Sequence, residues 1–351
     1  MRAKPPIPTI DEIRIELKAH GITHVGVAPA TPMLRARKAL AERKASGFAD
    51  NMSFTWRNPE RSTTPTASVA GAQSILVAAL PYLADDVTPA TGRRAHIARY
   101  ARADHYSILR TALRSVARNL KMAGERAVAF ADDNALVDRE AAYRAGIGWF
   151  GKNANLLLPG AGSYFVLGSI ITTAIYEPSQ PVDDGCGSCT RCLDGCPTGA
   201  IVAPGVIDAR RCLAWLLQKS GTFPTEMRAA LGDRIYGCDD CQEVCPPTVR
   251  LGRRNMSSAA PGLGEWVDPL AMLTMSDDEL LDTYGLWYFA ERDPRWLRRN
   301  AMIVLGNTAD PNDSETLDVL QSVIDGQDVV LAEHAQWAVD EIARRALQVP
   351  Q

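Results

Sequence analysis

The segment CGSCTRCLDGCPTGAIVAPGVIDARRCLAWLL, residues 186–217, holds five of the eight cysteines of this chain. Four of them fall within eleven residues and are followed by a proline, in the spacing C-x2-C-x2-C-x3-C-P: Cys186, Cys189, Cys192 and Cys196. Bacterial ferredoxins have this spacing, with three cysteines binding one 4Fe-4S cluster and the fourth binding another. The segment therefore predicts a ferredoxin-like fold with two clusters.

A second cysteine run completes the eight thiolates that two clusters need. It consists of Cys238, Cys241 and Cys245 in CDDCQEVCP, with Cys212 as a first member displaced upstream by an inserted helical segment. The crossed-ligand rule predicts that one cluster is bound by Cys186, Cys189, Cys192 and Cys245, and the other by Cys196, Cys212, Cys238 and Cys241.

A zinc site and a disulfide framework are the alternatives. Zinc sites usually lack a third cysteine at this spacing and the final proline. The N-terminal sequence MRAKPPIPTIDEIRIELK lacks the apolar run of a signal peptide, and no later segment approaches a membrane span. We therefore expect a cytoplasmic protein with no membrane partner, in which thiols stay reduced and disulfides are disfavoured.

The length of 351 residues predicts several units, and the net charge of -3 gives no overall electrostatic attraction for nucleic acid. We expect a mixed α+β protein with three domains: an α/β domain (1–178), an inserted ferredoxin-like domain (179–255) and a C-terminal helical, HEAT-like unit (256–351). In the first domain, hydrophobic patterns predict a capped helix from Thr9, a long helix near residues 106–123, and the strands ITHVGVA, SILVAALPYL, AVAFA and YFVLGSIITTA.

Neither G-x-G-x-x-G after a strand nor G-x-x-x-x-G-K-[ST] occurs, so dinucleotide and nucleoside-triphosphate sites are not supported. A two-cluster unit inside a much longer chain indicates that electrons are delivered to something else. The acceptor is expected to be a different cofactor or the substrate itself.

Two segments of the first domain are candidates for ligand binding. In IARYARADHYSILR, Arg102 and Asp104 precede a helix and are able to bind an anionic ligand, although a capped helix with a solvated face explains them equally well. In FADDNALVDREAAYRAGIGWFGKN, glycines allow close backbone approach before Lys152 and Asn153. Carboxylates that end a strand there are possible proton donors if buried. The alternative for these glycines is a simple turn.

The chain resembles the epoxyqueuosine reductases, the cobalamin-dependent iron-sulfur enzymes of the last step of queuosine synthesis in transfer RNA. The resemblance is carried by RYARADHYSILR, AGIGWFGKNANLLLPGAGSYFVLGSI, CGSCTRCLDGCPTGAI, RRCLAWL, GCDDCQEVCP and LRRNAMIVLGN. It implies that cobalamin lies between the α/β and cluster domains. It also implies that single electrons pass through the clusters to cobalt, and that the epoxide oxygen leaves as water.

The resemblance also implies roles for individual residues. The family's proton donor is an aspartate that matches Asp132, but Asp133 and Asp138 lie near enough to leave this choice open. Lys152 and Asn153 match the turn that faces the cofactor. Ser163 and Tyr164 are expected near it, and Arg102 and Asp104 join this set as candidate cofactor contacts.

The C-terminal part shows a helical repeat pattern. RWLRRNAMIVLGN and LAEHAQWAVDEIARR match with Ala301 and Ala335 in equivalent places, 34 residues apart. Arginines concentrate nearby, either as a nucleic-acid contact or as a solvated helix face: Arg250, Arg253, Arg254, Arg292, Arg295, Arg298 and Arg299. The resemblance implies that this tail binds the tRNA anticodon stem-loop that carries epoxyqueuosine.

An electron-donor protein such as flavodoxin or ferredoxin is the second expected partner, and the chain is expected to be a monomer. Two other functions are considered. One is a reductive dehalogenase-like enzyme, which also combines cobalamin with two clusters, although such enzymes are typically exported and lack a helical tail. The other is a non-enzymatic electron carrier with an RNA-binding tail, which leaves the first domain unexplained.

Overall fold

The N-terminal part is built on a four-stranded sheet. In the computed structural model, which describes residues 4–83, 92–251 and 262–348, the strands follow the order β1-β2-β7-β4. They are β1 (His24–Pro29), β2 (Ser74–Pro81), β4 (Ala127–Ala131) and β7 (Phe165–Thr172). The predicted mixture of helices and strands is confirmed, and all four strands lie where the sequence predicts them. Each neighbouring pair is antiparallel, however, so this part is not a parallel sheet of βαβ units.

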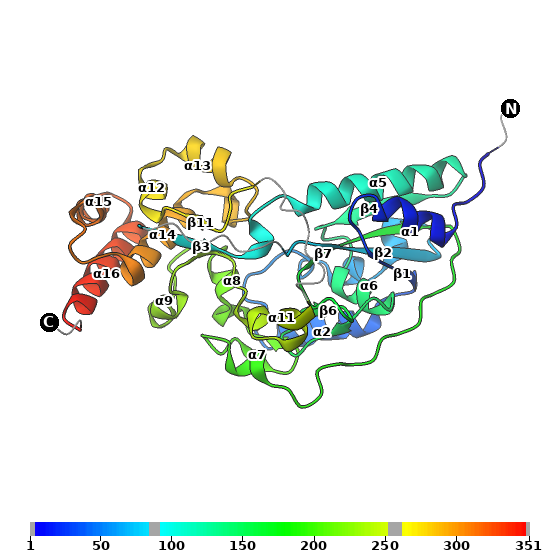
Figure 1. Ribbon diagram of the computed structural model, residues 1–351, viewed down its shortest axis with the longest axis horizontal. Coiled ribbons are helices and arrows are strands. Elements are labelled where there is room, and N and C mark those ends of the chain that lie inside the picture. Colours follow the sequence, from blue (N-terminus) through cyan, green and yellow to red (C-terminus); the bar gives the residue numbers. More distant parts are fainter. Residues whose placement is uncertain (1–3, 84–91, 252–261, 349–351) are drawn as a thin grey trace.

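Helices cover both faces of this sheet (Figure 1). On one face lie α1 (Ile10–Lys18) and α5 (His105–Met122), and on the other lie α2 (Leu34–Ala45) and α6 (Asp138–Arg144). Successive side chains of a strand point to opposite faces. Accordingly Leu76, Ala78 and Leu80 of β2 join the first core, and Ile75, Val77 and Ala79 join the second. The short helices α3 (Pro59–Ser62) and α4 (Pro65–Ser68) follow α2.

The cluster region consists of short elements joined by tight loops. It begins after the hairpin of β5 (Trp149–Phe150) and β6 (Leu156–Leu157) and the strand β7. Its elements are α7 (Arg191–Asp194), β8 (Ile201–Ala203), β9 (Val206–Ile207), η2 (Ala209–Arg211), α8 (Leu213–Leu216), α9 (Thr225–Leu231), β10 (Arg234–Tyr236), α10 (Asp240–Glu243) and α11 (Pro246–Leu251).

A second sheet joins segments from all three predicted domains. Its central strand β3 (Ala95–Ile97) precedes η1 (Arg99–Ala101), pairs in parallel with β10 and pairs antiparallel with β11 (Trp266–Val267). Side chains from β3, the cluster region and the C-terminal helices form one core around this sheet. The hydrophobic core around the second sheet therefore contains residues from all three predicted domains, so the predicted domain boundaries do not coincide with the limits of this core.

The C-terminal part is helical and lies at the opposite end of the molecule from the first sheet (Figure 1). It contains α12 (Pro269–Thr274), α13 (Asp277–Tyr284), η4 (Ala290–Arg292), α14 (Arg295–Thr308), α15 (Ser314–Ile324) and α16 (Val329–Ala346). Ala301 of α14 and Ala335 of α16 are both fully buried. Their matched burial agrees with the sequence period, while a HEAT-like repeat stays a prediction.

The prediction that Arg299 contributes to a basic surface of this tail is wrong. This side chain is fully buried and donates hydrogen bonds to the carbonyls of Leu216, Leu217, Lys219 and Gly221. The other tail arginines make protein contacts: Arg292 with the Gly285 carbonyl at 2.6 Å, Arg295 with Asp293 at 2.7 Å and Arg298 with Asp277 at 2.5 Å. Arg253 and Arg254 lie outside the described residues.

Within the described part of the chain, no helix is long and apolar enough to cross a membrane.

Candidate functional site

The eight cysteines lie on loops connected by helices of about one turn. Cys192 is in α7, Cys212 is the N-cap of α8, Cys241 is in α10, and Cys245 directly precedes α11. The Cys189 N–H donates to the Cys186 carbonyl at 3.1 Å and so closes a tight turn between these two cysteines. Short helices and sharp turns thus bring cysteines from distant segments together.

Electrostatic interactions link cysteine thiols from distant segments. Burial raises the pKa of the Cys192 thiol, and its neighbours Cys245, Cys186 and Cys189 raise it further. Burial also raises the pKa of Cys241, with smaller contributions from Cys212, Cys196 and Cys192, and that of Cys238, with contributions from Asp240 and Cys212. The two ligand sets predicted by the crossed-ligand rule are called here the first thiol group (Cys186, Cys189, Cys192 and Cys245) and the second thiol group (Cys196, Cys212, Cys238 and Cys241).

The two sets of the crossed-ligand rule and cluster binding itself stay predictions. Hydrogen-bond donors favour the thiolate that an iron ligand requires. The backbone N–H of Ala200 donates to the sulfur of Cys196 at 3.2 Å, and N–H groups of Trp215 and Ala214 lower the pKa of Cys212 against the larger effect of burial. Among the described residues, no three His, Cys, Asp or Glu side chains are placed together so that they could hold one metal ion.

The glycine-rich hairpin holds both cysteine loops. Lys152 Nζ donates to the carbonyls of Gly187 and Cys189 at 2.7 and 2.9 Å, and Asn153 Nδ2 donates to the Cys241 carbonyl at 3.1 Å. A Cβ on Gly148 would lie 2.4 Å from the Leu157 carbonyl oxygen across the hairpin. The glycine is therefore required by close backbone approach, and Lys152 positions the loop of the first thiol group.

Ser163 and Tyr164 are both buried beside the second thiol group and the first core. Ser163 Oγ donates to Gln242 Oε1 at 2.9 Å and lies 3.0 Å from Thr248 Oγ1. Tyr164 packs edge-on against Tyr82, with ring centroids 5.7 Å apart. Ser163 thus links the segment before β7 to α10, the helix that contains Cys241.

Arg102 and Asp104 make structural contacts. Arg102 donates to the Ile97 carbonyl at 3.0 Å and approaches Glu265 at 3.4 Å, next to the second sheet. Asp104 is the N-cap of α5 and accepts from the Ser107 N–H at 2.9 Å. Neither Arg102 nor Asp104 is among the described residues that line the cavity between the first sheet and the cluster region.

A cavity of about 560 Å³ lies between the first sheet and the cluster region. Three members of the second thiol group, Cys212, Cys238 and Cys241, face it, as do Asn153 and Ser163. Much of the remaining wall is aromatic, with polar groups spaced around it: Trp56, Tyr82, Tyr100, Tyr106, Trp215, Arg43, Arg139, Gln218 and Gln242. A mainly apolar cavity with a few polar groups is the usual form of a cofactor site.

The aromatic lining was missed from the sequence. Tyr100 and Tyr106 belong to the segment IARYARADHYSILR and Trp215 follows Cys212, whereas Trp56 lies in a separate stretch, and no shared period marks these four aromatic residues. Only the fold brings them together, so no local pattern could identify them.

Asp132 follows β4 and is not among the described residues that line the cavity. Its φ of 55° places it in the left-handed region, which is uncommon outside glycine. Its side chain is exposed to solvent, yet partial burial of the carboxyl raises its pKa, Arg110 opposes this shift and Asp133 adds to it. Its charge also raises the pKa of Tyr106, a cavity residue, behind the larger effect of burial. Asp132 is therefore an exposed carboxyl with a raised pKa that interacts electrostatically with one residue of the cavity wall.

The two neighbouring aspartates have different environments. Asp133 Oδ1 accepts from the Ala135 N–H at 2.8 Å and so closes a local turn. Asp138 starts α6, and burial raises the pKa of its carboxyl well above the ordinary value, with Asp132 contributing further. Within the described residues, Asp138 Oδ1 is buried without a hydrogen-bond partner.

Two family models match this chain. The model described as "Epoxyqueuosine reductase QueG, DUF1730" matches residues 63–133, which include Asp132 and end at Asp133, just after β4. The model described as "4Fe-4S double cluster binding domain" matches residues 185–248, which contain all eight cysteines.

Curated relatives and solved structures match almost the whole length. An epoxyqueuosine reductase of Bacillus anthracis is 34% identical over 336 residues, covering 93% of this chain and 87% of the relative. A crystal structure of epoxyqueuosine reductase with an epoxyqueuosine-modified tRNA-Tyr stem loop has a TM-score of 0.85 and 30% identity, covering 97% of this chain and 94% of that one. A Bacillus subtilis epoxyqueuosine reductase with its catalytic aspartate loop swung out of the active site has a TM-score of 0.84 and 30% identity, at the same coverages of 97% and 94%.

Proposed function

Because this chain belongs to the epoxyqueuosine reductase family and is an oxidoreductase, we propose that it reduces epoxyqueuosine to queuosine at the wobble position of a tRNA anticodon. The proposed cofactors are cobalamin and two 4Fe-4S clusters. The reaction takes up two electrons and two protons, forms an alkene and releases water. A reductive dehalogenase-like activity and a non-enzymatic carrier lack such support from the relatives.

One observation carries the proposal: a single cavity has thiols of the second group on its wall and a tyrosine beside Asp132 on the same wall. We infer that electrons from the cluster region and protons from a carboxyl near its wall can reach the same cavity. An epoxide reduction needs both at the same place.

The eight cysteines are the proposed cluster ligands, four from each thiol group. The N–H donors at the sulfurs of Cys196 and Cys212 favour the thiolates that iron ligands require. Lys152 and Asn153 bind the carbonyls of the cysteine loops and so keep these loops in place. Lys152 therefore supports the cluster region, and Asn153 supports it while also facing the cavity.

The cavity is the proposed site of cobalamin, whose flat corrin ring can pack on the aromatic wall while its amide side chains meet the polar groups. Asn153 and Ser163 are the predicted contacts that line it, with the aromatic wall around them. Tyr164 is placed behind this wall through its packing on Tyr82, a lining residue. When bound, cobalamin supplies a low-potential metal centre able to break the carbon–oxygen bond of the epoxide.

Asp132 is the proposed proton donor. Opening an epoxide places negative charge on oxygen, and a neutral carboxylic acid offsets this charge by donating its proton. The raised pKa of Asp132 keeps a larger fraction of the carboxyl protonated near neutral pH than an ordinary aspartate would have. Asp133 is already engaged in a turn, which favours Asp132 for this role.

The solved relative with a modified tRNA stem loop supports an anticodon stem-loop as the RNA partner. We propose a monomer that extrudes the modified base into the cavity, as enzymes that act on a single base do. The location in the cytoplasm and the electron-donor protein, a flavodoxin or ferredoxin, belong to the same proposal.

The proposal is tested with anaerobically purified protein, cobalamin, dithionite and an anticodon stem-loop that carries epoxyqueuosine. We expect about eight iron atoms per chain, cobalt and cluster absorption bands, and queuosine detected by mass spectrometry of the digested RNA. Absence of queuosine in a sample that contains both clusters and cobalamin would contradict it.

A further inference from the structure

The two thiol groups differ in their relation to the cavity. Cys212, Cys238 and Cys241 of the second group line it, whereas no member of the first group is among the described lining residues. The helix α10 lies at the border, because Cys241 and Gln242 face the cavity while Glu243 faces a different pocket. An electron that enters at the first thiol group therefore has the second group between itself and the cavity.

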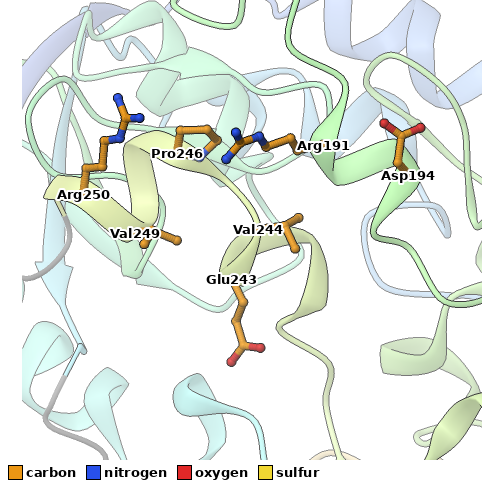
Figure 2. Close-up of a pocket in the computed structure, with 7 residues that line it drawn as sticks. All are labelled: Arg191, Asp194, Glu243, Val244, Pro246, Val249 and Arg250. Carbon is orange, nitrogen blue, oxygen red and sulfur yellow. The ribbon is translucent and has the colours of Figure 1, made fainter.

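That different pocket is open to solvent and has a volume of about 430 Å³. It lies between α7 and the segment α10 to α11, as Figure 2 shows. Arg191 is the sequence neighbour of Cys192, and Val244 and Pro246 flank Cys245. The pocket is thus the outer surface over two cysteines of the first thiol group.

The two arginines of this pocket lie apart from its acids. Arg191 and Arg250 are exposed, and within the described part of the chain neither guanidinium has an acidic partner. Glu243 pairs with Arg99 at 2.5 Å, whereas Asp194 accepts from Thr190 Oγ1 at 3.0 Å and keeps its negative charge. In Figure 2 the Glu243 carboxylate points away from both arginines, whose guanidiniums lie on either side of Pro246. Positive charge is therefore concentrated around Pro246, although the lining as a whole has two basic and two acidic side chains.

Apolar side chains lie between these charges. Val249 is 46% exposed, and Val244 and Pro246 complete a small hydrophobic centre. A small apolar centre with a charged rim is typical of weak interfaces between electron-transfer proteins, which are smaller than standard protein interfaces. Complementary charge at the rim mainly accelerates association.

On the basis of the proposed function, we propose that this pocket is the docking surface for a small acidic one-electron carrier protein, which reduces the cluster of the first thiol group. In each encounter the carrier loses one electron and that cluster gains it, with no bond made or broken and no proton transferred. Two encounters supply the two electrons for one epoxide. The second thiol group then lies on the way to the cavity.

RNA is the competing partner for an arginine-rich surface. Proteins that bind single-stranded nucleic acid combine positive charge with aromatic side chains on which the bases stack. Between its charged groups the pocket has Val244, Pro246 and Val249, and its described lining includes no aromatic residue on which a base could stack. Its composition therefore favours a protein surface over an RNA strand.

The test uses holoprotein with both clusters and reduced plant-type 2Fe-2S ferredoxin as the acidic carrier. Stopped-flow absorbance follows cluster reduction without any RNA present, and surface plasmon resonance measures binding of oxidised ferredoxin. In the double variant Arg191→Glu/Arg250→Glu, we expect the association rate at low salt to fall roughly tenfold or more. The difference should shrink near 1 M salt, where charges are screened within about 3 Å. Reduction by dithionite, which requires no docking, should proceed at the wild-type rate.

The matched control is Arg114→Glu/Arg118→Glu, which makes the same charge change at two exposed positions on α5. It should retain the wild-type rate with ferredoxin, and equal slowing in both double variants would mean that only net charge matters. Unchanged ferredoxin kinetics in Arg191→Glu/Arg250→Glu would overturn the proposal, and accompanying loss of stem-loop affinity would assign the surface to RNA. Neither readout depends on queuosine formation, so failure of the proposed reaction remains distinguishable from failure of the docking surface.

Discussion

At the scale of single residues, the backbone of Asp132 matters as much as its carboxyl. A non-glycine residue with positive φ is held there by its surroundings, and such residues concentrate at functional sites. Asparagine tolerates the same left-handed conformation. Asp132→Asn therefore removes the acidic proton with little change to the backbone.

We expect Asp132→Asn to bind both clusters and cobalamin but to lose turnover by a factor of about 10² to 10⁴, the usual contribution of a general acid. Single-turnover conversion of the modified stem-loop measures this, together with the melting temperature. Asp133→Asn is the matched control and should convert near normally, because an amide oxygen can still accept from the Ala135 N–H. Near-normal turnover in Asp132→Asn would show that Asp132 is not the proton donor.

Asp138 predicts a pH effect on stability. Its folded pKa lies well above the ordinary value because the carboxyl is buried, so its stabilising contribution is complete below the ordinary aspartate pKa. That contribution is lost as pH rises through the folded pKa. The asparagine of Asp138→Asn stays neutral at every pH. The melting temperature of this variant, relative to that of the wild type, should therefore rise between about pH 5 and about pH 8. A constant difference over this range would contradict the expectation.

The two thiol groups predict crossed effects of cysteine substitutions. Cys245→Ser should damage the cluster of Cys186, Cys189 and Cys192, which are distant in sequence, whereas Cys196→Ser should damage the other cluster. Iron analysis with Mössbauer or paramagnetic resonance spectroscopy identifies the cluster that is lost. Loss of the cluster of Cys238 and Cys241 in Cys245→Ser would show that the ligand sets are not crossed.

At the scale of elements, Arg299 explains how α14 supports the cluster region. The last carbonyls of a helix have no partner inside the helix. Arg299 donates to carbonyls at the end of α8, the helix that begins at Cys212. A cation at this end also interacts favourably with the helix dipole. The arginine is thus a helix cap supplied by another element.

Arg299→Met should lower the free energy of unfolding by about 3 kcal/mol or more, because several buried carbonyls lose a charged donor. Thermal and denaturant unfolding measure this loss. Arg295→Met, which removes an exposed ion pair on the same helix, should cost less than about 1 kcal/mol. Equal effects of the two substitutions would contradict the capping role.

Elements of the first sheet and of the cysteine loops follow from local patterns. Apolar runs predict β2 and β7, and the capping box at Thr9 marks the start of α1. Cysteine spacing predicts the two thiol groups. Arg299 was misassigned because a basic helix pattern does not reveal which side faces a neighbour. Arg102 and Asp104 were ambiguous for the same reason, since a cap and a ligand contact use the same residue types. The cavity wall comes from distant segments and needs the fold.

At the scale of the whole molecule, Trp287 ties the C-terminal part to the rest. It is 2% exposed, donates from Nε1 to the Ala101 carbonyl at 2.8 Å and stacks on Tyr236 at 4.5 Å. Tyr236 ends β10, two residues before Cys238. The aromatic pair therefore connects the C-terminal core to the second thiol group.

Trp287→Ala should cost about 3 to 5 kcal/mol of stability, as large-to-small substitutions of buried aromatic residues do. It should also lower iron occupancy at the second thiol group more than at the first. Melting curves and iron spectroscopy test both effects. Leu286→Ala is the control, since its side chain is 68% exposed and should change neither quantity measurably.

The position of β3 also sets an order of events during synthesis on the ribosome. Chains emerge from the N-terminus, and contacts between distant segments form only after both have been made. The first sheet can close once β7 has emerged, but β3 must wait for β10 and β11. Until then Ala95 and Ile97, both fully buried in the finished molecule, stay exposed. The nascent chain therefore holds β3 unpaired until β10 emerges, after five of the eight cysteines, and the second sheet is completed only when β11 follows the last cysteine.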